Sequence, residues 1–321
     1  MIGLARVADR GPLTAAALAA TLLLGALWVP VLIVSSGAAG LVLFASLFSM
    51  ACLIASAAVV AFVALRHGEL AASRVAGGCL LMMVVVSWGL YGTAIHIPLI
   101  ATVFWLPAVV SAFILARTVK LNFAVLSTVL CGVLSVVILA LVMGDTTAFW
   151  RSQFGDMGAN ATLPGGGASS GVLITEAQRE DFITAMASMM TGAMGVSVMS
   201  VALGALFLAR YWQGALFNPG GFQQEFHALS LGRNAALLCV LVIVLSLIVG
   251  GQVPSAIAMV VIFAFFIQGL AVVHALVKQR GMHRLWLHGV YVLLLLPHTV
   301  LLVAALGLAD NMFALRRPTK Q

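Results

Sequence analysis

Polar side chains within long apolar segments are the residues of this chain that could do chemistry. His274 and His298 each lie inside such a segment, and the amide of Gln268 precedes His274 by six residues. Polar or ionisable groups are expensive to bury in a membrane, so each of these residues is a candidate for contact with a ligand or partner. The simpler interpretation is a side chain whose hydrogen bonds are satisfied by neighbouring helices, and both interpretations stay open at this point.

Patterns that are typical of enzymes are missing from the chain. It contains no Gly-x-Ser-x-Gly, no His-Glu-x-x-His and no paired aspartates within an apolar run. The glycines at 165–167 are followed by Ala and Ser and lack the lysine of a phosphate-binding loop. Five methionines at 186–199 have thioethers that can bind Cu(I), but no cysteine or histidine accompanies them, so we interpret them as packing residues. We therefore predict no catalytic residue, no metal site, no cofactor and no enzyme.

The most distinctive polar motif spans residues 216–229, with the sequence LFNPGGFQQEFHAL. Its Asn-Pro-Gly-Gly part is a strong turn signal. The phenylalanines after it recur at helical spacing, which predicts a short amphipathic helix at the membrane surface. The glycines leave the N-terminus of this helix free to bind an anion, although the motif can also be a simple turn between two spans. The candidate contact residues here are Asn218, Pro219, Gly220, Gly221, Phe222, Glu225 and Phe226.

This motif, followed by Leu231, resembles the NPGGF-x-x-EF-x-x-L-x-L signature of the YybS-like family of uncharacterised bacterial membrane proteins. Residues 306–317 resemble the ending of that family, where a Gly-Leu-x-Asp turn precedes a short amphipathic stretch and an arginine pair. Asn311 and Ala314 depart from the family pattern, which has a Ser or Thr and an acid there. The family is distantly similar to the substrate-binding S components of energy-coupling-factor transporters, so the resemblance implies a solute-binding or assembly role. The tail adds Asp310, Arg316 and Arg317 to the candidate contacts.

Long uncharged segments decide the class of protein. No charged residue occurs between Arg10 and Arg66, a stretch of 55 residues. About 20 apolar residues span a bilayer as a helix, so this stretch crosses at least twice. The chain of 321 residues is 63% hydrophobic and only 8% charged, against about 25% charged in soluble domains. Because the apolar runs are continuous and do not alternate as in a transmembrane β-barrel, we predict an all-α polytopic integral membrane protein.

Nine membrane-spanning helices are the preferred prediction, within a single membrane domain that covers residues 1–321. The expected spans are residues 13–33, 41–65, 76–91, 99–115, 121–142, 182–208, 235–249, 255–277 and 285–306. A polar insert at 144–181 and an amphipathic connection at 210–234 separate some of them. The alternative is eight spans, because Pro297 and His298 can break the last segment into two half-length helices that re-enter on the inner side.

The distribution of charge predicts the orientation of the spans. With the N-terminus inside, eleven of the sixteen Lys and Arg residues fall in inner segments, and only Arg151 and Arg179 fall in the opposing loops. Basic residues are enriched in cytoplasmic loops, so we predict a multi-pass protein of the bacterial cytoplasmic (inner) membrane with a cytoplasmic N-terminus and an external insert. In the nine-span scheme the basic C-terminal tail lies outside, against this rule. The net charge of +7 is spread between spans without a dense basic tract, so we predict no nucleic-acid partner.

Two functional hypotheses from different classes follow. The first is a small-solute binding or transport component that resembles an S component, contacts its solute near Asn218, Gln268 and His274, and needs an energising partner protein. The second is a non-transporting scaffold or assembly factor that binds a partner protein or anionic lipid through its inner amphipathic segments, 218–229 and 310–317. A closed, water-accessible cavity favours the first hypothesis. A solid helical core with an exposed apolar or basic patch on its inner face favours the second.

Overall fold

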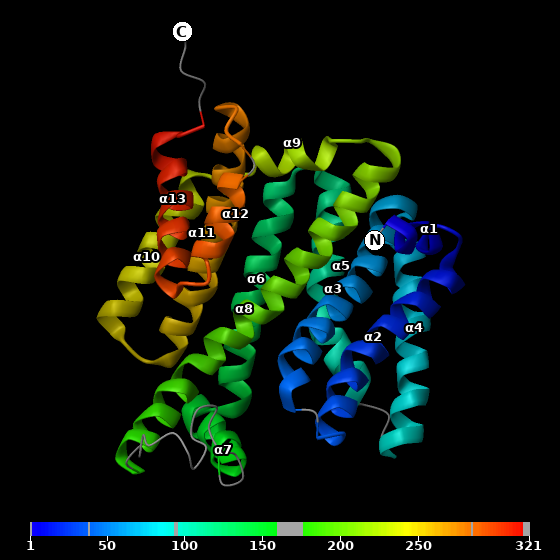
Figure 1. Cartoon of the computed structure of the whole chain (residues 1–321), viewed down its shortest axis with the longest axis horizontal. Coiled ribbons are helices and arrows are strands. Elements are labelled where there is room, and N and C mark those ends of the chain that lie inside the picture. Colours follow the sequence, from blue (N-terminus) through cyan, green and yellow to red (C-terminus); the bar gives the residue numbers. More distant parts are fainter. Residues whose placement is uncertain (1, 38, 93–95, 159–175, 284, 317–321) are drawn as a thin grey trace.

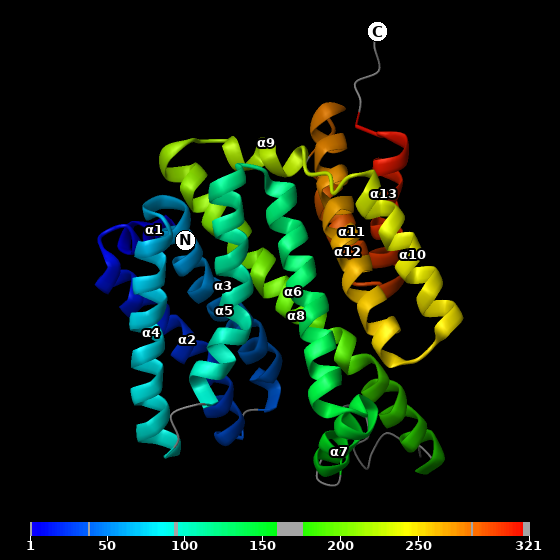
Figure 2. The ribbon, with the colours of Figure 1, turned by 180° about the vertical axis from the view of Figure 1, so that it is seen from behind.

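The computed structural model describes residues 2–37, 39–92, 96–158, 176–283 and 285–316, and every regular element in these ranges is a helix (Figures 1 and 2). Seven of the described helices are each long and apolar enough to cross a membrane. They are α2 (Pro12–Ser35), α3 (Val42–His67), α4 (Glu69–Tyr91), α5 (His96–Thr118), α6 (Leu121–Met143), α8 (Glu176–Phe217) and α11 (Gln252–Gln279). The prediction of an all-α polytopic membrane protein is confirmed.

Shorter helices connect the long ones. They are α1 (Ile2–Ala8), the 3-10 turn η1 (Ala39–Leu41), α7 (Thr146–Gly158), α9 (Gly221–His227), α10 (Arg233–Val249), α12 (Leu285–Leu293) and α13 (Pro297–Phe313). The 17 residues of α10 are just enough to span a bilayer. The predicted boundaries differ most at α8, whose 42 residues extend the span expected at 182–208 in both directions. Residues 159–175 of the predicted insert lie outside the described residues.

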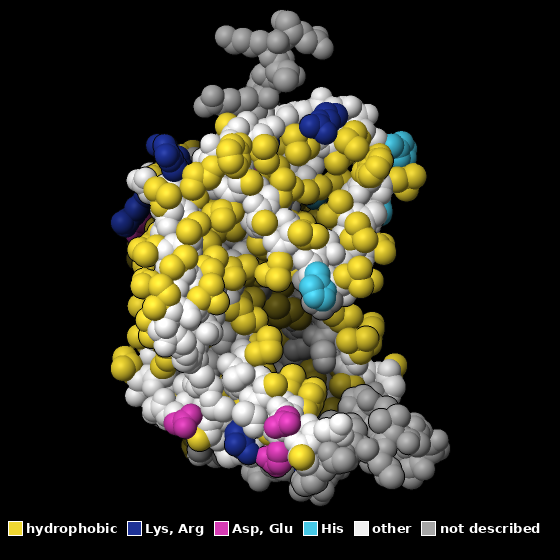
Figure 3. All heavy atoms as spheres, turned by 90° about the vertical axis from the view of Figure 1, so that its left-hand side faces the viewer, with side chains coloured by type: hydrophobic (Ala, Val, Ile, Leu, Met, Phe, Trp, Pro, Cys, Tyr) yellow, Lys and Arg dark blue, Asp and Glu magenta, His cyan; other side chains and the backbone are white. Residues whose placement is uncertain are grey.

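The helices run between two ends of different charge. The N-terminus, α1 and α9 lie at one end, and α7 lies at the other (Figures 1 and 2). We call the first the basic end, because it carries these described residues: Arg6, Arg10, Arg66, Arg74, Arg117, Lys120, Arg210, Arg233, Lys278, Arg280 and Arg316. The other, the insert end, carries Arg151 and Arg179. Figure 3 shows the division, with most of the visible Lys and Arg near the top and most of the visible Asp and Glu at the bottom. Which end faces the cytoplasm stays a prediction.

Glycines bring the central helices into close contact. α8 packs against α3, α5, α6 and α11, as its many small residues favour. A Cβ atom on Gly195 would lie 2.6 Å from Cγ2 of Val136 and 3.1 Å from the carbonyl oxygen of Gly132, so α6 and α8 touch backbone to backbone. A Cβ on Gly132 would lie 2.9 Å from Val260 of α11. The three helices therefore form one tightly packed junction.

The last apolar segment folds back instead of crossing. α12 and α13 meet at an angle of 119°, and Pro297 occupies the first turn of α13, where its missing N–H costs nothing (Figure 1). The amide of Gln279, at the end of α11, donates to the carbonyl oxygen of Arg316 at 3.3 Å, so the chain leaves and re-enters the basic end. The preferred count of nine spans is therefore wrong. The alternative of eight, with re-entry at Pro297 and His298, agrees with the seven long helices plus α10, and it places Arg316 among the other basic residues.

Two more glycines fix α13 on α11. A Cβ on Gly307 would lie 2.1 Å from the carbonyl oxygen of Phe265, and one on Gly269 would lie 1.9 Å from that of Val303. Any larger residue at either position would push the helices apart. α12 packs far less and leaves Trp286 and its neighbouring apolar side chains exposed, as is typical of a surface that faces lipid.

Candidate functional site

The Asn-Pro-Gly-Gly motif forms the turn between α8 and α9. Gly220 has a φ of +87°, a left-handed conformation that favours glycine. A Cβ on Gly221 would lie 2.6 Å from Nδ2 of Asn218, so the second glycine leaves room for that amide. Asn218, Pro219 and Gly220 are exposed at the rim of the basic end. The turn prediction is confirmed, and these residues shape the backbone without lining the pocket described below.

The apolar face of α9 packs onto protein. The rings of Phe222 and Phe226 lie 5.7 Å and 5.6 Å from the ring of Phe207 on α8. Glu225, on the other face, accepts two hydrogen bonds from the Arg210 guanidinium, one of them at 2.8 Å. The predicted amphipathic helix is therefore present, but its apolar side contacts α8 where we expected the membrane surface. It is also short, ending at His227 before Leu229.

The C-terminal tail fastens the end of α9. Arg316 pairs with Asp310 at 2.5 Å, and the exposed fractions of the two side chains are only 14% and 3%. The same guanidinium donates to the carbonyl oxygens of His227 at 2.6 Å and Leu229 at 2.9 Å. The two motifs that the sequence singled out, far apart along the chain, thus meet at one buried ion pair.

Gln268 joins this pair to the loop that follows α9. Its side chain is fully buried, and its Oε1 accepts hydrogen bonds from the backbone N–H of Leu231 at 2.9 Å and from Nδ2 of Asn311 at 3.1 Å. Its Nε2 donates to Asp310 at 3.3 Å. Gln268 therefore uses these side-chain hydrogen bonds within the protein, where they connect α11 to α13 and to the loop after α9.

Asn311 is the residue of this network that the sequence did not select. Its Oδ1 accepts from the hydroxyl of Ser230 at 2.9 Å and from the backbone N–H of Gly232 at 3.0 Å. In the sequence it was visible only as a departure from the family pattern at a position next to Asp310. We call these four residues the polar clamp: Gln268, Asp310, Asn311 and Arg316.

A polar pocket of about 560 Å³ opens beside the clamp, between α9, α11 and α12. Its lining residues are Gln223, His227, His274, Val277, Lys278, Gly281, Met282 and Leu287. His274 is held there by the hydroxyl of Tyr291 on α12, 3.0 Å from its Nε2, and by a T-shaped contact with the Phe226 ring, whose centroid lies 5.7 Å away. Of the two intramembrane histidines in the prediction, His274 reaches this pocket. His298 lies exposed at the start of α13 and takes no part in it.

The pocket is electropositive. Among the described residues that line it, none is acidic, while Lys278 is positively charged. Burial lowers the pKa of His227 below its ordinary value of 6.5, and the neighbouring Lys278, His274 and Arg316 lower it further. Sequence reasoning missed Lys278 and Gln223 because nothing in their local pattern distinguishes them from other polar residues at a membrane rim.

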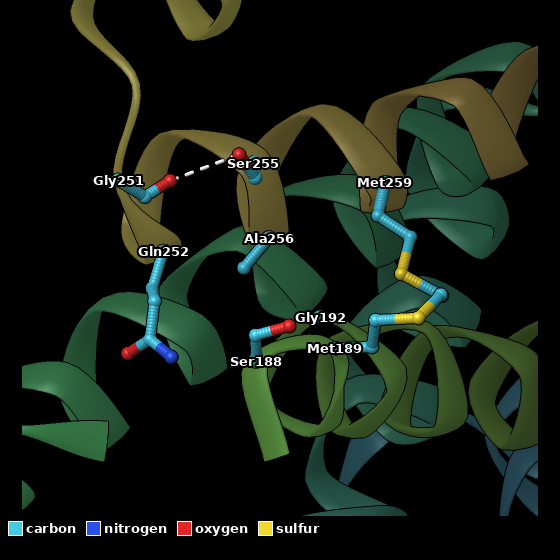
Figure 4. Close-up of a pocket in the computed structure, with 8 residues that line it drawn as sticks. All are labelled: Ser188, Met189, Gly192, Gly251, Gln252, Ser255, Ala256 and Met259. Carbon is cyan, nitrogen blue, oxygen red and sulfur yellow. Dashed lines mark hydrogen bonds between the residues drawn. The ribbon is translucent and has the colours of Figure 1, made fainter. Parts of the chain in front are cut away.

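A second pocket, of about 340 Å³, lies at the insert end between α8 and α11 (Figure 4). The thioethers of Met189 and Met259 lie side by side along it. Oε1 of Gln252 accepts from the hydroxyl of Thr146 at 2.5 Å, while its Nε2 is buried without a partner among the described residues. No charged side chain lines this pocket. No three His, Cys, Asp or Glu side chains of the described residues gather as metal ligands.

Comparisons of the chain with protein-family models, with characterised proteins and with solved structures found no match. The resemblance to the YybS-like family therefore stays a prediction. Arg317, the second arginine of the predicted pair, lies outside the described residues.

Proposed function

We propose that this chain is a non-transporting scaffold or assembly protein of the bacterial cytoplasmic membrane, which binds anionic headgroups and partner proteins at its basic end. The polar clamp is the observation that carries the proposal. It joins α9, the loop at 228–232 and the C-terminal tail into one surface through a buried ion pair and buried amides. A surface of fixed shape favours binding, because few side chains and loops lose conformational freedom when a partner binds.

The packing of the spans supports the same choice. The backbones of α6 and α8 touch at Gly132 and Gly195, and those of α11 and α13 touch at Gly269 and Gly307. The two polar pockets lie at opposite ends of the molecule. A transporter typically binds its solute near the middle of the bilayer, between spans. Between the spans the described residues leave two pockets, of about 290 and 450 Å³, and no charged side chain lines either of them. A charged solute would find no counter-charge there, which favours the scaffold over the solute carrier.

Unpaired cations supply the attraction for anionic headgroups. The described acids at the basic end already have basic partners: Asp9 pairs with His67, Glu69 with Arg117, Glu225 with Arg210, and Asp310 with Arg316. Lys120 and Arg233 are exposed and have no acidic partner among the described residues. A basic residue near an anionic leaflet contributes about 1 kcal/mol of attraction. The proposal therefore places the basic end at the cytoplasmic leaflet, in agreement with the charge rule.

The test is lipid selection. The protein is reconstituted into nanodiscs of equal phosphatidylglycerol and phosphatidylcholine, re-extracted in a mild neutral detergent, and its retained lipids are quantified by mass spectrometry. We expect phosphatidylglycerol to be enriched several-fold over the input. The double variant Lys120→Gln/Arg233→Gln should lose much of this enrichment. The matched double variant at the insert end, Arg151→Gln/Arg179→Gln, should keep it.

The same spectra address the competing hypothesis. Retention of both lipids in the input ratio, by wild type and variants alike, would contradict headgroup selection. A small solute recovered at one copy per chain would favour the solute-binding component instead, above all if it survived the loss of the basic-end charges.

A further inference from the structure

Four segments build the pocket beside the polar clamp, and its polar side chains come from two of them, α9 and α11. α9 supplies the amide of Gln223 and the imidazole of His227, and α11 supplies His274 and Lys278. The connection after α11 supplies backbone and the Met282 side chain, with Leu287 of α12 closing the apolar side. Donors therefore converge from two helices on a space that is large enough for a headgroup.

The charges around the pocket favour an anion. The two acids of the neighbouring segments, Glu225 and Asp310, are each occupied by an arginine, so neither neutralises Lys278. Arg316 contacts the carbonyl oxygen of His227 but is itself paired with Asp310, so Lys278 is the charge of the pocket that is left for an anion. The same positive field that opposes a proton on His227 attracts a negative ligand.

The depth of the pocket selects the kind of anion. Lys278 is the penultimate residue of α11, where this membrane-spanning helix ends and the headgroup layer of a bilayer begins. Phosphate is the anion found at that level. Its oxygens can accept hydrogen bonds from several directions at once, which suits donors that come from α9 and α11.

We propose that this pocket binds a phosphate group, carried on a lipid headgroup or on a soluble ester, with Lys278 as its charge partner and His227 taking up a proton from solvent on binding. This inference deepens the proposed function and rests on it for the placement of the basic end at the headgroup layer. The groups that face His227 are His274 and Lys278 of α11 and Arg316 of the tail. All three disfavour the protonated form of His227, and the negative charge of a bound phosphate offsets their effect.

The proton uptake makes binding pH-dependent. The pKa of His227 is lowered in the free protein, so a ligand that restores it toward or above 6.5 binds more tightly as the pH falls through that region. Phosphate monoesters themselves titrate near pH 6, whereas a phosphodiester keeps one negative charge throughout. A soluble phosphodiester, glycerophosphoglycerol, is therefore the probe that isolates the histidine.

The experiment measures binding of glycerophosphoglycerol to the full chain in a neutral maltoside detergent, by calorimetry between pH 5.5 and 8. Lys278→Gln should weaken binding by about tenfold or more, the order expected when a hydrogen bond to a charged group is lost. Arg280→Gln, an exposed cation two residues away that does not line the pocket, should change affinity less than twofold. The affinity of the wild type should rise as the pH falls, and His227→Asn should lose this rise. Its backbone carbonyl still accepts from Arg316, so the clamp is kept.

Two results overturn the inference: equal weakening by the Lys278 and Arg280 variants, or an unchanged pH profile in His227→Asn. Nanodiscs of phosphatidylglycerol are compared with nanodiscs of phosphatidylcholine, whose phosphate is neutralised by choline, to test whether the phosphate of an anionic lipid is the preferred source. Binding of the soluble ester without any lipid preference supports the pocket and contradicts the scaffold proposal. Lipid selection that is insensitive to Lys278→Gln supports the scaffold proposal and contradicts the pocket.

Discussion

The substitution Asp310→Asn removes one charge from the ion pair at the centre of the polar clamp and changes almost no volume. The carboxylate is 3% exposed and its partner guanidinium 14%, so solvent screens the pair little. After the change, Arg316 keeps its positive charge in a buried place without a counter-charge. It does retain the carbonyl oxygens of His227 and Leu229 as acceptors.

The magnitude follows from that balance. Breaking a buried ion pair by removing one partner costs about 3–5 kcal/mol. Because two strong carbonyl acceptors remain, we expect the lower end, about 3 kcal/mol, or roughly a hundredfold in the unfolding equilibrium. The matched control is Glu69→Gln, which breaks an ion pair whose side chains are 42% and 73% exposed. A surface pair of this kind contributes under about 1 kcal/mol.

The assay is equilibrium unfolding in mixed micelles of maltoside and dodecyl sulfate, followed by tryptophan fluorescence. A second readout is limited proteolysis of the C-terminal tail, which Asp310→Asn should accelerate because Arg316 then holds the tail through the two carbonyl oxygens alone. The reasoning is refuted if Asp310→Asn costs no more than Glu69→Gln, or if the tail is equally protected in both.

Three further outcomes are expected. Gly307→Ala places a Cβ 2.1 Å from the carbonyl oxygen of Phe265 and should lower the free energy of unfolding by about 3 kcal/mol, the upper end for overpacking. Gly289→Ala is the control, since no atom lies within 4 Å of its added Cβ, and its unfolding midpoint should equal that of the wild type within error. In a cysteine-free background, single cysteines at Asn218 and Leu315 should react with an impermeant maleimide from one side of the membrane and a cysteine at Ser152 from the other; reaction at Leu315 from the side of Ser152 would restore the nine-span scheme. Stability should fall on acidification from about pH 6.5 toward the lowered pKa of His227, because the unfolded state binds the proton more readily, and His227→Asn should flatten that slope in pH-dependent unfolding curves.

The spans were predictable because their signal is local and strong. Continuous apolar runs of bilayer length fixed their existence, and Pro297 with His298 already indicated where the last one could break. The wrong count came from treating hydrophobicity over 285–306 as sufficient for a crossing. Length and apolarity do not report the direction of the chain after a break, which is decided here by the fit of Gly307 against α11.

The site was predictable only in part. Gln268 and His274 were predicted as polar residues within apolar segments, and Asp310 and Arg316 through the resemblance of the tail. The structure does bring the four to one region. Several of their partners lie 37 to 89 residues away, such as Leu231 for Gln268 and His227 for Arg316, and no local pattern reveals these contacts. Helical spacing likewise gave α9 an apolar face without telling whether lipid or Phe207 would cover it. His274 and His298 looked equivalent in sequence, and only the direction of each helix separates them.

The re-entrant hairpin has a consequence for biogenesis. α12, with 9 residues, is too short to span a bilayer, and α13, with 17, follows a break that turns the chain back toward the basic end. The hairpin therefore folds late, when α11 is complete and α13 can pack against its Gly269. In a chain that ends before Gly307, the face of α11 around Gly269 would contact lipid acyl chains, and Arg316 would be missing. Such a chain would have all its membrane crossings but an unpacked C-terminal end, which quality-control proteases would recognise.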